Sequence, residues 1–172
     1  MDLTELGWTP AFEQQFAAHR DQRLEPARIA TYLENFPHHK FARENWKAER
    51  WRQHFWAYCR LTELVDAQIG QVLDAIRDAG LENNTLIVFS ADHGELAMSH
   101  GGMVEKFYNT YQESINVPLI FSNPKLFPEG QTTDALAALV DVVPTIAALV
   151  GAQDAAAFQG QDLTPVLADP AA

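Results

Sequence analysis

Apolar residues recur at intervals of three and four along the middle of the chain, which predicts helical structure between residues 45 and 79. The apolar positions fall on one face of such a helix, and most charged positions fall on the other. The apolar positions are Leu61, Leu64, Val65, Ile69, Val72, Leu73 and Ile76. Gly80 follows them, and we expect it to adopt the left-handed conformation that often ends a helix. The segment is therefore predicted as one or two amphipathic helices that end at Gly80.

Two short apolar runs, residues 85–89 and 117–121, predict β-strands because each is bounded by turn-forming residues. Residues 133–140 are a candidate for a third strand. We expect Asp141 to cap a helix that continues through residue 150. Since strands alternate with helices, the predicted fold class is α/β, with a largely parallel sheet flanked by helices.

The first 45 residues carry weaker signals. Thr9 and Pro10 predict a helix with Thr9 as N-cap and Pro10 in the first helical position. His38 and His39 lie side by side near a break in the pattern, with no accompanying carboxylate motif. We therefore expect the histidine pair to be a loop feature, with a metal site as the alternative.

Composition narrows the class of protein. The chain has 172 residues, the size of one domain with a single core, and 23 acidic against 12 basic residues give a net charge of −11. This charge argues against a nucleic-acid or anionic-membrane partner. No apolar run approaches the roughly 18 residues of a membrane span, and the first residues lack the layout of a secretion signal. We expect a soluble protein of undetermined compartment, in which the single Cys59 is a packing residue.

The most informative position is the end of the first predicted strand, where Asp92 and His93 stand next to each other. Ligands of α/β proteins bind outside the carboxyl ends of strands, and carboxylate and imidazole are both metal ligands. Taken alone, the same residues could close an Asx turn and make ordinary hydrogen bonds. The motifs that follow favour a metal site.

Those motifs occur in a specific order. They are Asp92-His93-Gly94-Glu95, Ser99-His100-Gly101, Lys106, Tyr111-Gln112-Glu113-Ser114 and Val117-Pro118-Leu119-Ile120. In this order the segment resembles the C-terminal half of a sulfatase, within the alkaline-phosphatase-like superfamily. The resemblance extends to residues 65–73, 139–145 and 160–163. It implies the alkaline-phosphatase-like fold, of which this chain would be an incomplete, C-terminal part.

The resemblance also implies roles for individual residues. Asp92 and His93 would bind a divalent metal, although many sulfatases carry Asn in place of His93. His100 and Lys106 would be the catalytic residues that contact the sulfate and the leaving-group oxygen. Glu95 would support His93 or Lys106 as an outer partner. We expect calcium, with magnesium as the other ion that oxygen ligands favour. Manganese and zinc are further alternatives because an imidazole ligand also admits them.

One part of the sulfatase site has no counterpart in the sequence. Sulfatases convert a Cys or Ser in a Cys/Ser-x-Pro-x-Arg motif to formylglycine, and they carry further acidic metal ligands near it. This chain contains no such motif, so it does not encode the formylglycine. We expect a product of a split or truncated gene that is inactive alone and that pairs with the missing N-terminal half or with itself. Glu113 is expected to be structural.

Two alternatives stay open. A phosphodiesterase or phosphonate monoester hydrolase of the same superfamily would use the same two-part site on a tetrahedral phosphorus. A noncatalytic remnant would bind a metal or a partner chain without turnover. In either case residues 1–45 are expected to be an N-terminal helical segment of uncertain role, and residues 46–172 the sulfatase-like α/β portion.

Overall fold

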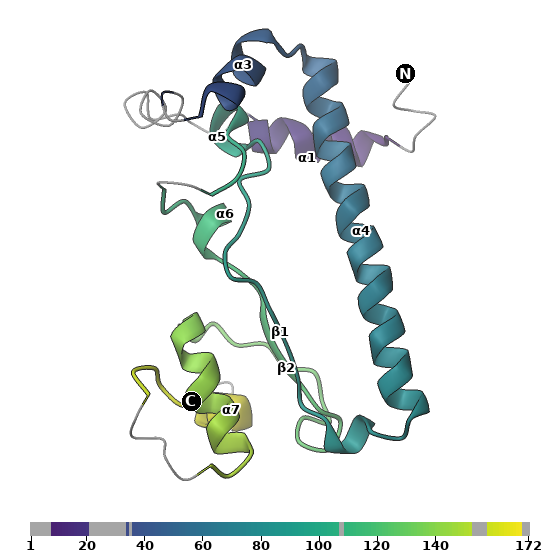
Figure 1. Ribbon diagram of the computed structural model, residues 1–172, viewed down its shortest axis with the longest axis vertical. Coiled ribbons are helices and arrows are strands. Elements are labelled where there is room, and N and C mark those ends of the chain that lie inside the picture. The colour runs from purple at the N-terminus through teal and green to yellow at the C-terminus, as the bar shows by residue number, and fades with distance from the viewer. Residues whose placement is uncertain (1–7, 21–33, 35, 107–108, 153–157, 170–172) are drawn as a thin grey trace. The chain divides into compact units, whose positions relative to one another are not determined.

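A computed structural model describes residues 8–20, 34, 36–106, 109–152 and 158–169 of the chain (Figure 1). The chain divides into two compact units, Met1–Phe121 and Ser122–Ala172. In chain order the elements are α1 (Pro10–Arg20), α3 (Pro37–Asn45), α4 (Ala48–Asp78), η1 (Glu82–Asn84), β1 (Ile87–Ser90), α5 (Ser99–Gly102), α6 (Gln112–Ile115), β2 (Leu119–Ser122), η2 (Leu139–Asp141), α7 (Val142–Leu149) and α8 (Thr164–Ala168).

The amphipathic segment forms one long helix, α4, as Figure 1 shows. It ends as expected at Gly80, whose φ of +68° is accessible because glycine lacks a Cβ. The N–H groups of Gly80 and Leu81 donate to the carbonyls of Arg77 and Ile76 at 2.9 and 3.1 Å. No helix among the described residues is long and apolar enough to span a membrane.

The apolar face of the C-terminal half of α4 is exposed to solvent. Leu61, Leu64, Val65 and Val72, hereafter the α4 apolar face, each keep 54–62% of their surface accessible. Large apolar stripes on soluble proteins usually mark surfaces that pack against another surface. The α4 apolar face is therefore suited to a contact outside the described residues.

The N-terminal half of α4 packs against α1. This helix begins at Pro10, and the Thr9 hydroxyl accepts an N–H from its first turn, as predicted. Phe16 of α1, Phe55 of α4 and Met98 of the loop after β1 form a buried cluster. Cys59 packs beside this cluster, and burial raises the pKa of its thiol, which keeps the thiol protonated and fits a packing role.

The sheet differs from the expectation. β1 and β2 form a two-stranded sheet, and the strands run in opposite directions (Figure 1). A parallel pair requires a long crossover, usually a covering helix. Between the strands, the described residues 91–106 and 109–118 contain only the short helices α5 and α6. The predicted largely parallel sheet is thus corrected, for the described residues, to one antiparallel pair. Residues 133–138 are exposed and form no strand, so the third predicted strand is also absent there.

Two local predictions are corrected as well. His38 and His39 lie in the first turn of α3 and not in a loop. Asp141 occupies the N-cap position of α7, as predicted, but its side chain makes no capping hydrogen bond. Its carboxylate instead accepts the N–H groups of Gln161 at 2.7 Å and Ala138 at 2.8 Å. These hydrogen bonds, the one from Gln161 foremost, hold the pKa of Asp141 below its usual value.

Candidate functional site

The strand β1 presents Asp92 and His93 just beyond its carboxyl end. The two side chains lie together, with His93 Nε2 3.4 Å from Asp92 Oδ2. The backbone N–H of His93 also donates to Asp92 Oδ1 at 3.0 Å. The Asp92 carboxylate is 86% exposed, so it is open to a ligand from outside the described residues.

This pair has the properties of two metal ligands. His93 Nδ1 lies 2.9 Å from the carbonyl oxygen of Gly94, and because a carbonyl only accepts, Nδ1 carries the hydrogen. In the neutral ring the lone pair is on Nε2, which lies 3.4 Å from Asp92 Oδ2, and such a backbone hydrogen bond commonly fixes a metal-binding histidine. Two adjacent ligand atoms of one divalent ion lie about 2.8–3.5 Å apart for ordinary bond lengths and coordination numbers. The residues present therefore fit a divalent metal, to which this pair could contribute two ligand atoms.

Gly94 brings this loop against the segment that precedes β2. Its N–H donates to the carbonyl of Ser114 at 2.9 Å. A Cβ on Gly94 would lie 1.9 Å from the carbonyl oxygen of Glu113, a distance that no side chain can occupy. Only glycine allows this approach, which places the Asp92–His93 loop directly beside residue 113.

Glu113 in turn holds His100. His100 Nε2 lies 3.0 Å from Glu113 Oε2, and both side chains are largely buried. The imidazole also stacks on Tyr111, with ring centroids 3.8 Å apart and planes 14° apart. Glu113, which we expected to be only structural, therefore orients the predicted catalytic histidine. Neither this pairing nor the Tyr111 stack follows from sequence spacing, since the partners lie 13 and 11 positions from His100 in different local elements.

The loop that carries His100 has an uncommon backbone. Ala97, Met98, His100 and Glu105 all have positive φ values, between 44° and 75°. Such conformations cost energy for residues other than glycine and persist where the surroundings enforce them, often at functional sites. Burial of the residues on either side of Met98 supplies part of that constraint.

Glu95 supplies another part of the constraint on the backbone of this loop. Its Oε1 accepts the N–H of Ala97 at 3.0 Å and the N–H of Glu105 at 2.5 Å, which joins the two ends of the loop. The sequence suggested that Glu95 supports His93 or Lys106 side chains; in the structure these bonds support the loop backbone. Lys106 is half-buried and directly follows Glu105, so Glu95 acts on its position through the main chain.

The close approach at Gly94 leads to a paired prediction. Gly94→Ala should destabilise the chain by about 1–3 kcal/mol, as overpacking does, because the added methyl pushes against Glu113. Gly70→Ala is the matched control: it lies inside α4 with no atom within 4 Å of the new methyl, and it should stabilise by about 0.5–1 kcal/mol. Urea unfolding measures both, and equal effects of the two substitutions would contradict the packing described at Gly94.

Comparisons with known proteins agree with the motif order. A family model described as Sulfatase matches residues 9–152. Arylsulfatase K of Xenopus laevis is 35% identical over 118 residues, which is 67% of this chain and 20% of that protein. Delta 4,5-hexuronate-2-O-sulfatase of Bacteroides thetaiotaomicron is 34% identical over 72% of this chain and 26% of that protein.

A solved structure also superposes on the chain. The structure of BT4656 in complex with its substrate D-glucosamine-2-N,6-O-disulfate aligns with a TM-score of 0.65 and 28% identity. The alignment covers 82% of this chain and 29% of that one. Across these comparisons the chain spans 20–29% of the length of the proteins it matches.

Proposed function

Since the chain belongs to the sulfatase family, we propose that it is the C-terminal part of a metal-dependent sulfatase that hydrolyses a sulfate ester. The observation that carries the proposal is the shared position of Glu113. It contacts Gly94 of the Asp92–His93 loop through its backbone and His100 through its side chain. This arrangement favours one site in which metal ligands and catalytic residues act on the same group.

In this proposal Asp92 and His93 Nε2 hold the metal, which when bound polarises a nonbridging sulfate oxygen as a Lewis acid. His100 donates a hydrogen bond to the ester oxygen and assists departure of the alcohol. Glu113 and Tyr111 keep the His100 ring in one orientation for that transfer. Lys106 contributes a compact positive charge that stabilises the developing negative charge on the sulfate.

The net negative charge of the chain is a reason for the site to need local positive charge. The net charge of −11 repels an anionic ester on average. Local positive charge in a cleft can outweigh a mean field that is screened beyond about 8–10 Å at ordinary salt concentrations. The bound metal and Lys106 therefore supply the attraction that the rest of the surface lacks.

The nucleophile is supplied by a part of the enzyme that this sequence does not encode. We define the completed enzyme as this chain joined to the formylglycine-bearing part of a sulfatase. It should hydrolyse an aryl sulfate faster than an aryl phosphodiester, and the chain alone should hydrolyse neither. A preference for the phosphodiester would favour the phosphodiesterase alternative, and metal binding without any turnover would favour the noncatalytic remnant.

The α4 apolar face is the proposed contact with that missing part, or with a second copy of the chain. Burying one leucine side chain contributes about 1.5–3 kcal/mol, so Leu64→Glu should weaken association by about 10- to 150-fold. Leu64 is exposed, so the substitution leaves the fold of the chain itself intact. Sedimentation velocity measures the association, both of the chain alone and of its mixture with the nucleophile-bearing part.

The control for this prediction is Gly70→Glu, which adds the same charge on the side of α4 opposite to the α4 apolar face, where no atom lies within 4 Å of a new Cβ. It should leave association unchanged. If the chain alone sediments as a sharp monomer and also fails to bind the nucleophile-bearing part, the proposed role of the α4 apolar face is wrong.

A further inference from the structure

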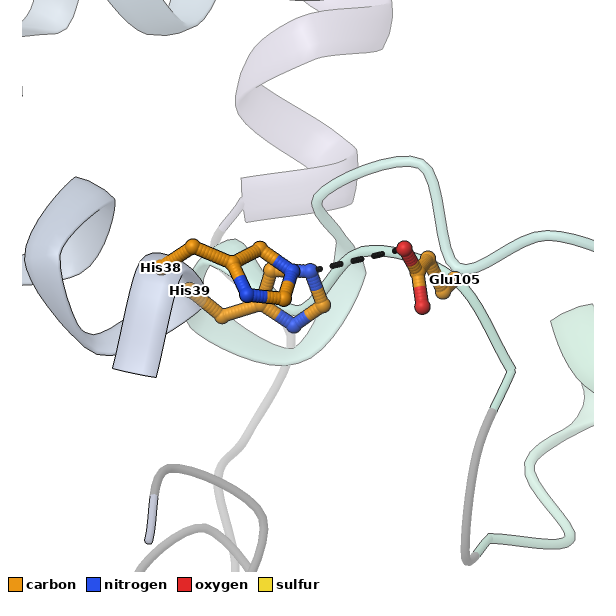
Figure 2. A group of neighbouring side chains, drawn as sticks. All are labelled: His38, His39 and Glu105. Carbon is orange, nitrogen blue, oxygen red and sulfur yellow. Dashed lines mark ion pairs between the residues drawn. The ribbon is translucent and has the colours of Figure 1, made fainter. Parts of the chain in front are cut away.

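A second cluster of potential metal ligands lies outside the proposed sulfatase site. Figure 2 shows His38 and His39 side by side, with the His39 ring directed at Glu105. One ligand atom from each of the three residues lies within 4.8 Å of the other two. The histidines come from the first turn of α3 and Glu105 from the loop after α5, so the cluster joins two segments far apart in the sequence.

The spacing of the cluster suits a bound ion better than a direct contact. His39 Nε2 lies 3.7 Å from Glu105 Oε1, which is too long for a hydrogen bond. Two ligands on a tetrahedral zinc ion are about 3.3–3.5 Å apart, so a shift of a few tenths of an ångström would let both bind one ion. His38 is exposed, which leaves its ring free to rotate onto the same ion.

The protonation of His39 also favours metal binding. Its side chain is only 5% exposed, and this burial, together with the neighbouring His38, lowers the pKa of His39. This direction favours the neutral imidazole, which offers the lone pair that a metal needs. Two imidazoles with one carboxylate form a donor set that zinc uses in proteins.

The surrounding structure holds two of the three ligands in place. The His39 ring stacks on Phe36, with centroids 5.3 Å apart and planes 23° apart. Glu105 has a φ of +65°, and its N–H is bound by the Glu95 carboxylate. Binding at such prearranged ligands costs less conformational entropy than ordering them from a flexible loop.

We propose that His38, His39 and Glu105 bind one divalent ion of the zinc class, at a site separate from Asp92 and His93. A bound ion would link α3 to the residue that precedes Lys106 and would so fix the loop of the proposed catalytic residues. The site follows from the three side chains alone and does not rest on the proposed sulfatase activity.

The test is a titration of the whole chain with zinc by calorimetry, and with cobalt(II) by visible absorption, which reports four-coordinate nitrogen and oxygen ligation. We expect one ion per chain at this site. His38→Ala and Glu105→Gln should each weaken its binding at least about tenfold, because each removes a ligand. Asp92→Ala should leave this binding unchanged, and it separates the two metal sites.

The His38→Ala variant distinguishes loss of a ligand from loss of the fold, because His38 is exposed and its removal leaves the buried core in place. Far-UV circular dichroism of each variant verifies the fold. Absence of zinc binding by the wild-type chain would overturn the proposal, as would unchanged affinity in both His38→Ala and Glu105→Gln. Loss of the same signal in Asp92→Ala would assign the ion to the other site and overturn it too.

Discussion

Replacing His100 with alanine should lower kcat of the completed enzyme by roughly 100- to 10,000-fold, the range expected when a general acid is removed. The reason is that His100 is the one proposed proton donor to the leaving alcohol, held by Glu113 Oε2 at 3.0 Å and by the stack on Tyr111. The measurement is the steady-state rate with an aryl sulfate. The rate should fall more for a substrate with a poor leaving group than for one with a good leaving group, because departure of a poor leaving group depends more on protonation of its oxygen.

Two further variants sharpen this prediction. Glu113→Gln keeps the size of the side chain but removes its charge, so it should lower kcat less than His100→Ala does. His54→Ala, at a half-buried histidine of α4, should leave kcat within about twofold of wild type. If His100→Ala retains the wild-type rate with a poor leaving group, His100 is not the acid.

Replacing Asp92 with alanine should weaken binding of the activating metal by at least about 100-fold, more than the loss of an outer partner costs. The substitution removes the proposed anionic ligand, which lies 3.4 Å from His93 Nε2, and it leaves a single proposed imidazole ligand from this loop. Calorimetric titration with calcium and with manganese measures the affinity. The metal concentration for half-maximal activity of the completed enzyme should rise in parallel.

Asp66→Ala is the matched control, since Asp66 is an exposed aspartate on α4 far along the chain from the loop. Asp92→Asn should fall between the two, because the amide oxygen can still bind while the charge is lost. Unchanged metal affinity in Asp92→Ala would contradict the assignment of this residue as a ligand.

The local sequence pattern was sufficient to predict the structural features that depend only on neighbouring residues. The three-and-four spacing from Leu61 to Ile76 predicted α4, and Gly80 predicted its left-handed end. The apolar run before Asp92 likewise predicted the strand β1, which ends at Ser90. In each case the signal and its physical cause lie within one turn of helix or a few residues of strand.

The sequence pattern could not predict features that depend on contacts between residues far apart in the chain. The direction of β2 is set by how residues 91–118 turn back, and no periodicity encodes it. The carboxylate beside His38 and His39 comes from Glu105, 66 positions after His39, so the histidine pair had no visible partner in the sequence. Glu113 and Glu95 were recognised as nearby charges, but their hydrogen bonds to His100 and to the loop backbone required the fold.

The most direct test of the account is a crystal structure of the completed enzyme with manganese and sulfate bound, in which anomalous scattering locates the metal. We predict a manganese peak about 2.0–2.4 Å from both Asp92 and His93 Nε2. The sulfate should lie within about 3.2 Å of both His100 and Lys106 Nζ. A metal bound without Asp92 and His93, or a sulfate distant from His100 and Lys106, would contradict a single shared site.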